Sequence, residues 1–104
     1  MYIRILLEHK NNNDPNAVMA RIFKEGNVNY LVRGEDNPEF PNLSLVESYD
    51  YSDFGPEDVP GIIKELTKVK EEVSDPSDKA HIDDIIHLAE RCKTMPDTVL
   101  VFAG

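Results

Sequence analysis

Four side chains around position 87 have residue types and spacing that could bind a metal ion: Asp83, Asp84, His87 and Glu90. The three acids stand three or four residues from His87, so a helix would place them on neighbouring turns. Carboxylate and imidazole groups in such an arrangement can hold a divalent cation. The alternative is a solvated helix face, on which each acid–histidine pair contributes only ~0.3 kcal/mol. We favour the solvated face and predict neither a metal site nor a cofactor.

No other group of residues has the pattern of a catalytic site. Cys92 is the single cysteine, and its place in an apolar helical stripe favours a packed core residue over a nucleophile. The five glycines are scattered, whereas a phosphate-binding loop needs several of them together. His9 and His81 have no better context than His87. We predict no catalytic residue and expect that the protein is not an enzyme.

Length and composition predict one cytoplasmic domain that covers residues 1–104. A chain of 104 residues, of which 40% are hydrophobic, can build a single core. No window approaches the ~20 apolar residues of a membrane span, and the apolar run at residues 5–7 is too short for a signal sequence. One cysteine is consistent with a reducing compartment. We therefore expect no membrane partner.

The charge of the chain is concentrated in one segment. The formal net charge of −9 argues against nucleic acid as a direct ligand, because phosphate binding depends on clustered Lys and Arg. Residues 34–63, the acidic segment, contain no Lys or Arg, while the rest of the chain carries twelve acids and eleven bases. The eight carboxylates of the acidic segment are Glu35, Asp36, Glu39, Glu47, Asp50, Asp53, Glu57 and Asp58.

Aromatic residues stand among these carboxylates: Phe40, Tyr49, Tyr51 and Phe54. Charge of one sign attracts a basic surface over a distance, and fixed rings supply contact area at low entropic cost. Two alternatives remain open, namely carboxylates that serve solubility alone and a core position for one or two rings, with Phe54 packed against the following helix. We predict a partner-binding surface made of the eight carboxylates, with Tyr49, Tyr51 and Phe54 as candidate anchors.

The first half of the chain has the pattern of strands. Residues 2–8 alternate in the period of two that is typical of a strand, and residues 11–15 favour a loop. Residues 17–24 and 28–33 stand on either side of Glu25-Gly26-Asn27 and predict a hairpin, with a helix over 16–24 as the alternative. Residues 43–47 predict a short fourth strand. Residues 48–56 have no regular period and are expected to lie on the surface.

Two helices and a closing strand follow. Asp58 is the expected N-cap of the first helix, with Pro60 in its first turn. Ser77 is the expected cap of the second helix, with Asp78 in its first turn, where a carboxylate meets the positive end of the helix dipole. Residues 98–102 are apolar on both faces and predict a central strand. The order β-β-β-β-α-α-β predicts an α+β fold, in which two helices pack on one face of a mostly antiparallel sheet of four to five strands.

Three passages of the second half have a familiar form: Pro60-Gly61-Ile62-Ile63-Lys64-Glu65-Leu66, Ile85-Ile86-His87-Leu88-Ala89-Glu90-Arg91-Cys92 and Pro96-Asp97-Thr98-Val99-Leu100-Val101-Phe102. Residues 59–104 thereby resemble the bacterial immunity proteins of contact-dependent growth inhibition and other polymorphic toxin systems. The resemblance implies a small cytoplasmic protein that binds and blocks one cognate toxin, usually a nuclease, without catalysis. It carries over no functional residue, because such families share no active-site motif.

The charge pattern and the resemblance point to the same function. A toxin that cuts nucleic acid presents a basic cleft to phosphates, and an acidic surface can fill that cleft. We therefore expect an immunity protein that neutralises a cognate basic toxin domain, a nuclease. One alternative is a small regulatory or adaptor domain that binds a basic protein through the same residues. The other is a small metal-dependent enzyme that uses the helix face around His87.

Overall fold

The structure is a computed structural model that describes residues 1–10 and 18–104. The loop predicted at residues 11–15 falls outside the described residues. In chain order the elements are β1 (Arg4–His9), β2 (Val18–Phe23), α1 (Val28–Leu31), the 3-10 helix η1 (Leu43–Leu45), β3 (Tyr51–Phe54), the 3-10 helix η2 (Pro56–Asp58), α2 (Val59–Glu72), α3 (Pro76–Lys93) and β4 (Thr98–Ala103).

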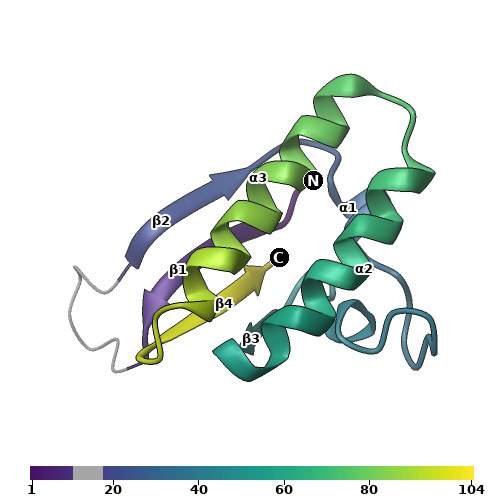
Figure 1. The fold of residues 1–104 in the computed structure, drawn as a ribbon. Coiled ribbons are helices and arrows are strands. Elements are labelled where there is room, and N and C mark those ends of the chain that lie inside the picture. Colours follow the sequence, from purple (N-terminus) through teal and green to yellow (C-terminus); the bar gives the residue numbers. More distant parts are fainter. Residues whose placement is uncertain (11–17) are drawn as a thin grey trace.

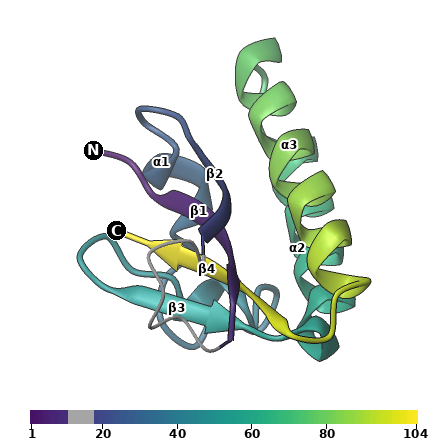
Figure 2. The same cartoon turned by 90° about the vertical axis from the view of Figure 1, so that its left-hand side faces the viewer.

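Four antiparallel strands form one sheet in the order β2-β1-β4-β3. The two long helices, α2 and α3, both lie on one side of this sheet (Figure 1, Figure 2). The predicted α+β class is therefore confirmed. β4 lies between β1 and β3, which is the central position that its two apolar faces predicted.

The core fills the space between the two long helices and the inner face of the sheet. Alternate strand residues turn inward, because successive side chains of a strand point to opposite faces. The inward side chains of the sheet are Ile5, Leu7, Phe54, Leu100 and Phe102. They meet the buried stripe of α2, which is Val59, Ile62, Leu66 and Val69, and that of α3, which is Ile82, Ile85, Leu88, Ala89 and Cys92.

The second strand of the predicted hairpin is wrong, because Val28–Leu31 form helix α1. Gly26 has a φ of +85°, a turn conformation that suits glycine. The N–H of Leu31 then bonds the carbonyl of Asn27 at 2.9 Å, which closes a helical turn. Tyr30 and Leu31 are both buried, whereas a strand would turn consecutive side chains to opposite faces.

The fourth strand was placed in the wrong segment. Leu43–Leu45 form η1 rather than a strand, and the fourth strand of the sheet is β3 within residues 48–56, where no regular structure was expected. The backbone N–H of Leu43 bonds the Glu65 carboxylate at 2.9 Å, so this donor is used by a helix side chain and not by a strand. β3 is an edge strand of four residues, and charge is common on such strands because it blocks edge-to-edge association.

The helix starts differ from the prediction in their capping groups. α2 begins directly after Asp58, but the Asp58 side chain makes no capping hydrogen bond. α3 is capped by Asp75 and not by Ser77: the Asp75 carboxylate accepts the N–H of Ser77, and Pro76 takes the first helical position. A proline is well suited there because its missing N–H has no partner to lose.

Candidate partner-binding surface

The face of the sheet that points away from α2 and α3 is the candidate binding surface, here called the outer face. Its side chains form rows that cross all four strands. One row is Phe23, Arg4, Ala103 and Tyr51, and the next is Arg21, Leu6, Val101 and Asp53. The small apolar cluster at its centre contains strand residues only, namely Leu6, Val101 and Ala103 with Val18 and Val99 around them. Neither long helix therefore contributes to it.

A hollow of about 310 Å³ opens on the outer face above Ala103. We call it the tyrosine hollow; its lining is Arg4, Leu6, Glu8, Tyr49, Asp50, Tyr51, Val101, Ala103 and Gly104. Tyr49 and Tyr51 stand beside it with 85% and 68% of their surface exposed. Its side next to β3 has two rings and the Asp50 carboxylate, which suit the guanidinium of an arginine because arginine binds ring faces and carboxylates alike, while Arg4 lines the opposite side.

A second hollow of about 470 Å³ lies next to the first and shares several of its residues. Its lining is Glu8, Lys10, Tyr51, Asp53, Val99 and Val101. Tyr51 separates two acids, Asp50 on one side and Asp53 on the other. The β3 side of the outer face therefore carries exposed rings and carboxylates, while Arg4 and Lys10 also line the two hollows.

The carboxylates of the acidic segment are not neutralised inside the molecule. All eight are exposed. The ion pairs among the described residues use other acids, namely Glu25, Glu72, Asp78 and Asp83. Asp50 accepts the backbone N–H of Tyr51 at 2.8 Å, which fixes the carboxylate beside the ring. The negative charge of the segment is thus available to a partner.

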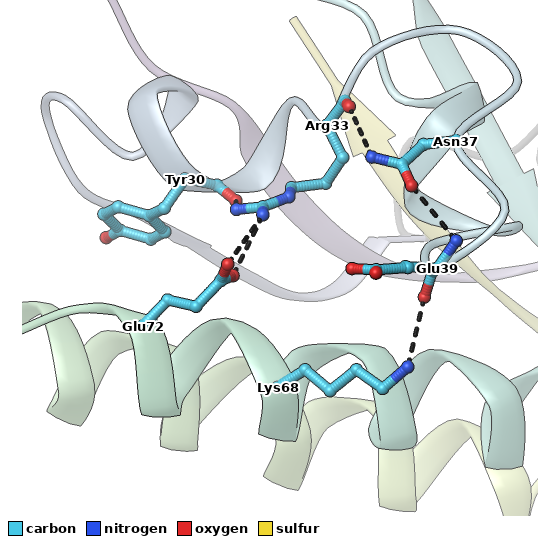
Figure 3. A network of polar contacts seen from close by, with 6 residues as sticks. All are labelled: Tyr30, Arg33, Asn37, Glu39, Lys68 and Glu72. Carbon is cyan, nitrogen blue, oxygen red and sulfur yellow. Dashed lines mark hydrogen bonds and ion pairs between the residues drawn. The ribbon is translucent and has the colours of Figure 1, made fainter.

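The first three of these acids lie away from the outer face. Glu35, Asp36 and Glu39 belong to the loop that follows α1, and this loop is held against α2 (Figure 3). The Lys68 ammonium on α2 donates to the Glu39 carbonyl at 3.4 Å, and Arg33 pairs with Glu72 at 2.9 Å. This part of the predicted surface is therefore mixed in charge.

The other predicted site residues are divided between surface and core. Glu57 and Asp58 are exposed in η2 at the start of α2, and Glu47 is exposed between η1 and β3. Phe54 is 3% exposed and meets Phe102 edge-to-face, with ring centres 5.8 Å apart. Phe54 therefore cannot anchor a partner, and the alternative of a core position is the right one. Phe40 is also buried, with the Arg33 guanidinium 4.2 Å from its ring centre.

Two of the residues considered for chemistry, Asp83 and Cys92, make contacts within the fold, whereas Asp84, His87 and Glu90 are exposed. Asp83 forms an ion pair with Lys70 at 2.8 Å. Within residues 1–10 and 18–104, no three His, Cys, Asp or Glu side chains lie together as metal ligands would. Cys92 is fully buried beside Thr98, and burial raises the pKa of its thiol. A buried neutral thiol is a poor nucleophile.

Sequence reasoning missed Arg4, Leu6, Val101 and Ala103, which shape the tyrosine hollow. A signal for them was present. Residues 98–102 are apolar on both faces, while the two predicted helices cover only one face of the sheet. The second apolar face of a central strand therefore had to line either another layer or an exposed depression.

Comparison of the chain with protein-family models, curated proteins and solved structures finds no match. In the part of the chain that the structure describes, no helix has the length and apolar character needed to cross a bilayer.

Proposed function

We propose that this protein is an immunity protein that binds and neutralises a cognate basic toxin domain, a nuclease, through the acidic segment around β3. One observation carries the proposal: Tyr49 and Tyr51 stand exposed beside the tyrosine hollow, next to Asp50 and Asp53, which form no ion pair among the described residues. Exposed rings next to unpaired carboxylates favour a partner that supplies both apolar contact and positive charge.

The two kinds of side chain have different roles in this interface. Carboxylates such as Asp50 and Asp53 attract the basic toxin before contact and so raise the rate of association. Tyr49 and Tyr51 lose water on contact and so slow dissociation, because buried rings dominate binding energy. The tyrosine hollow accepts one arginine of the toxin. An arginine that normally holds a phosphate would be held there by the Asp50 carboxylate.

Protection of cells from the toxin tests the proposal. The probe is a basic nuclease domain sought among the genes beside this one, and it is produced in a bacterial host together with the protein. Growth should return with the native chain and fail with the variant Tyr49→Ala/Tyr51→Ala. The matched control is Glu71→Ala/Glu90→Ala, which removes two exposed side chains from the two long helices.

Two results would count against the proposed function. If the double tyrosine variant protects as well as the native chain, the interface lies elsewhere. If the purified protein binds the domain but cells still die, it is an adaptor for a basic protein rather than an immunity protein. Binding of the protein to the isolated toxin domain is measured by calorimetry, so that loss of binding can be told apart from loss of protection.

A further inference from the structure

Each row of the outer face is complementary to the same row taken in the opposite direction. The row Arg21–Leu6–Val101–Asp53 begins with a base, ends with an acid and has two apolar residues between them. The row Phe23–Arg4–Ala103–Tyr51 begins and ends with an exposed ring. A surface that matches its own reverse can pair with itself about a two-fold axis, because such an interface uses the same patch on both subunits.

We propose that two copies of this chain associate through their outer faces, with a two-fold axis parallel to the strands and between β1 and β4. The axis places β2 of one copy opposite β3 of the other, and β1 opposite β4. Sheets that pack face to face stay within ~30° of alignment, so rows near the axis remain opposite each other. The occupant of the outer face in the free protein is thus a second copy.

Each position in the two rows then meets a suitable residue. Arg21 lies opposite Asp53 of the second copy, and the symmetry gives this ion pair twice. Leu6 lies opposite Val101 of the second copy, which joins the two small apolar clusters. Phe23 lies opposite Tyr51 of the second copy, and offset rings attract each other.

The remaining position of the row Phe23–Arg4–Ala103–Tyr51 is Arg4, and it provides an occupant for the tyrosine hollow. The axis places Arg4 opposite Ala103 of the second copy, which lines the hollow of that copy. Arg4 is exposed and has no ion pair among the described residues. In the dimer its guanidinium enters the hollow of the second copy and meets Tyr49, Asp50 and Tyr51, on the side of Ala103 opposite the second copy's own Arg4.

Charge across the outer face favours a second copy over a uniformly basic partner. The side of β1 and β2 carries Arg4 and Arg21, which repel a basic surface, as well as Glu8, while the β3 side carries Asp50 and Asp53, which attract it. A basic toxin matches only the β3 side, whereas a second copy matches both. The dimer and the proposed toxin complex therefore compete for Tyr51 and Asp53.

The area of the outer face sets the expected affinity of the dimer. Four strands ~4.8 Å apart, with up to six residues each at ~3.3 Å per residue, give a face of roughly 20 Å by 20 Å. Its area of roughly 400 Å² is smaller than the ~800 Å² per partner of a standard interface. The net charge of −9 on each copy also opposes association. We therefore expect a dissociation constant in the micromolar range, so the dimer gives way to a tighter complex.

Exchange of the charges at positions 21 and 53 tests the proposed dimer. Sedimentation equilibrium over the micromolar range should show a monomer–dimer equilibrium for the native chain. Arg21→Asp and Asp53→Arg should each weaken the dimer about tenfold or more, because each creates two like-charge contacts. The double variant Arg21→Asp/Asp53→Arg restores opposite charges and should return the dissociation constant to near the native value. Both positions are exposed, and thermal melting checks that every variant is folded.

Three outcomes would overturn the dimer: a native chain that stays monomeric, single variants that dimerise normally, or a double variant that remains monomeric. The proposed function fails differently. Toxin binding has no reason to be rescued by the double variant, because Asp53→Arg still removes an acid from the toxin surface. Calorimetry with the toxin domain on the same variants therefore separates the two proposals.

Discussion

The side chain of Asn27 takes the place of a neighbouring strand for Ile3. Its Oδ1 accepts the N–H of Ile3 at 2.6 Å, and its Nδ2 donates to the carbonyl of Ile3 at 2.8 Å. Both residues are fully buried, so these backbone groups have no water as a substitute. The same Nδ2 reaches Nε2 of His81 on α3 at 3.1 Å. One amide thus connects the residue before β1, the start of α1 and the second turn of α3.

We predict that Asn27→Ala lowers the free energy of unfolding by ~3 kcal/mol, because it leaves two buried backbone groups and one imidazole nitrogen without partners. Urea denaturation followed by circular dichroism measures the change. The control is Asn29→Ala, which alters an exposed asparagine two residues away and should cost little. Equal losses of unfolding free energy in the two variants would show that the hydrogen bonds of the Asn27 amide do not stabilise the fold.

The stability of the protein should fall as the pH drops below about 6.5, the ordinary pKa of histidine. Ile3 fixes the direction of the Asn27 amide, so Nε2 of His81 has to accept a hydrogen bond and the ring has to be neutral. Burial lowers the pKa of His81; Lys24 also lowers it, while Asp78 and Asp84 act in the opposite direction. Near this pH, His81 therefore binds a proton in the unfolded chain that it does not bind in the folded chain. Stability contributed in this way is present above the unfolded pKa and is lost as the pH falls.

The variant His81→Gln separates this effect from the titration of carboxylates. A glutamine oxygen can accept the bond from Asn27 but takes up no proton near pH 6. Urea unfolding at pH 7.5 and pH 5.5 should show a smaller loss for this variant than for the native chain. A single proton changes stability by at most ~1.4 kcal/mol per pH unit. His87→Gln, at an exposed position on the same helix, serves as the control, and an unchanged slope in His81→Gln would contradict the assignment.

Glu65 should be the most costly carboxylate to remove. It is 3% exposed on α2 and accepts the N–H groups of Asn42 at 3.0 Å and Leu43 at 2.9 Å, as well as the Asn42 side-chain amide at 2.6 Å. We predict that Glu65→Ala lowers the free energy of unfolding by ~3 kcal/mol, because charge-assisted bonds in a buried site are strong. Glu71→Ala, exposed on the same helix, should change the midpoint in urea only slightly.

These contacts explain which parts of the fold the sequence predicts. α2, α3 and β4 follow from periodic apolar residues and nearby caps, which are local signals. α1 and η1 depend on Asn27 and Glu65, whose partners lie 24 and 22 or 23 residues away in the chain. A local pattern contains no information about such a partner. Residues 28–33 and 43–47 were therefore read as strands, since their apolar spacing alone suits a strand equally well.

The sequence likewise predicts some parts of the candidate site and not others. The charge of the acidic segment and the exposure of Tyr49 and Tyr51 follow from composition and the lack of a period. The tyrosine hollow does not, because it needs Arg4 and Ala103 from strands at opposite ends of the chain. Phe54 stands three residues from Tyr51, yet the alternation of β3 turns it inward. Sheet register, and not sequence proximity, decides which rings a partner can reach.

The three neighbouring rings should therefore differ in what their removal costs. Tyr49→Ala with Tyr51→Ala should leave the melting temperature nearly unchanged, because both side chains are largely exposed, and should weaken toxin binding by ~100-fold or more. Phe54→Ala should instead cost ~3–4 kcal/mol of stability through the cavity left in the core. Differential scanning calorimetry and isothermal titration calorimetry measure the two effects. A large loss of stability in the tyrosine variant would place those rings in the core.

Association with the proposed toxin partner should depend on where the negative charge lies and not only on its amount. Asp50→Asn/Asp53→Asn and Glu71→Gln/Glu90→Gln change the net charge equally, but only the first pair borders the two hollows of the outer face. In stopped-flow measurements at low salt, the first variant should associate several-fold more slowly than the second. Raising the ionic strength shortens the Debye length from ~10 Å at 0.1 M to ~3 Å at 1 M, so the native rate should fall toward that of the first variant. The dissociation rate should change much less. If the two variants associate equally fast, or if salt leaves the native rate unaltered, the acidic segment does not steer the toxin.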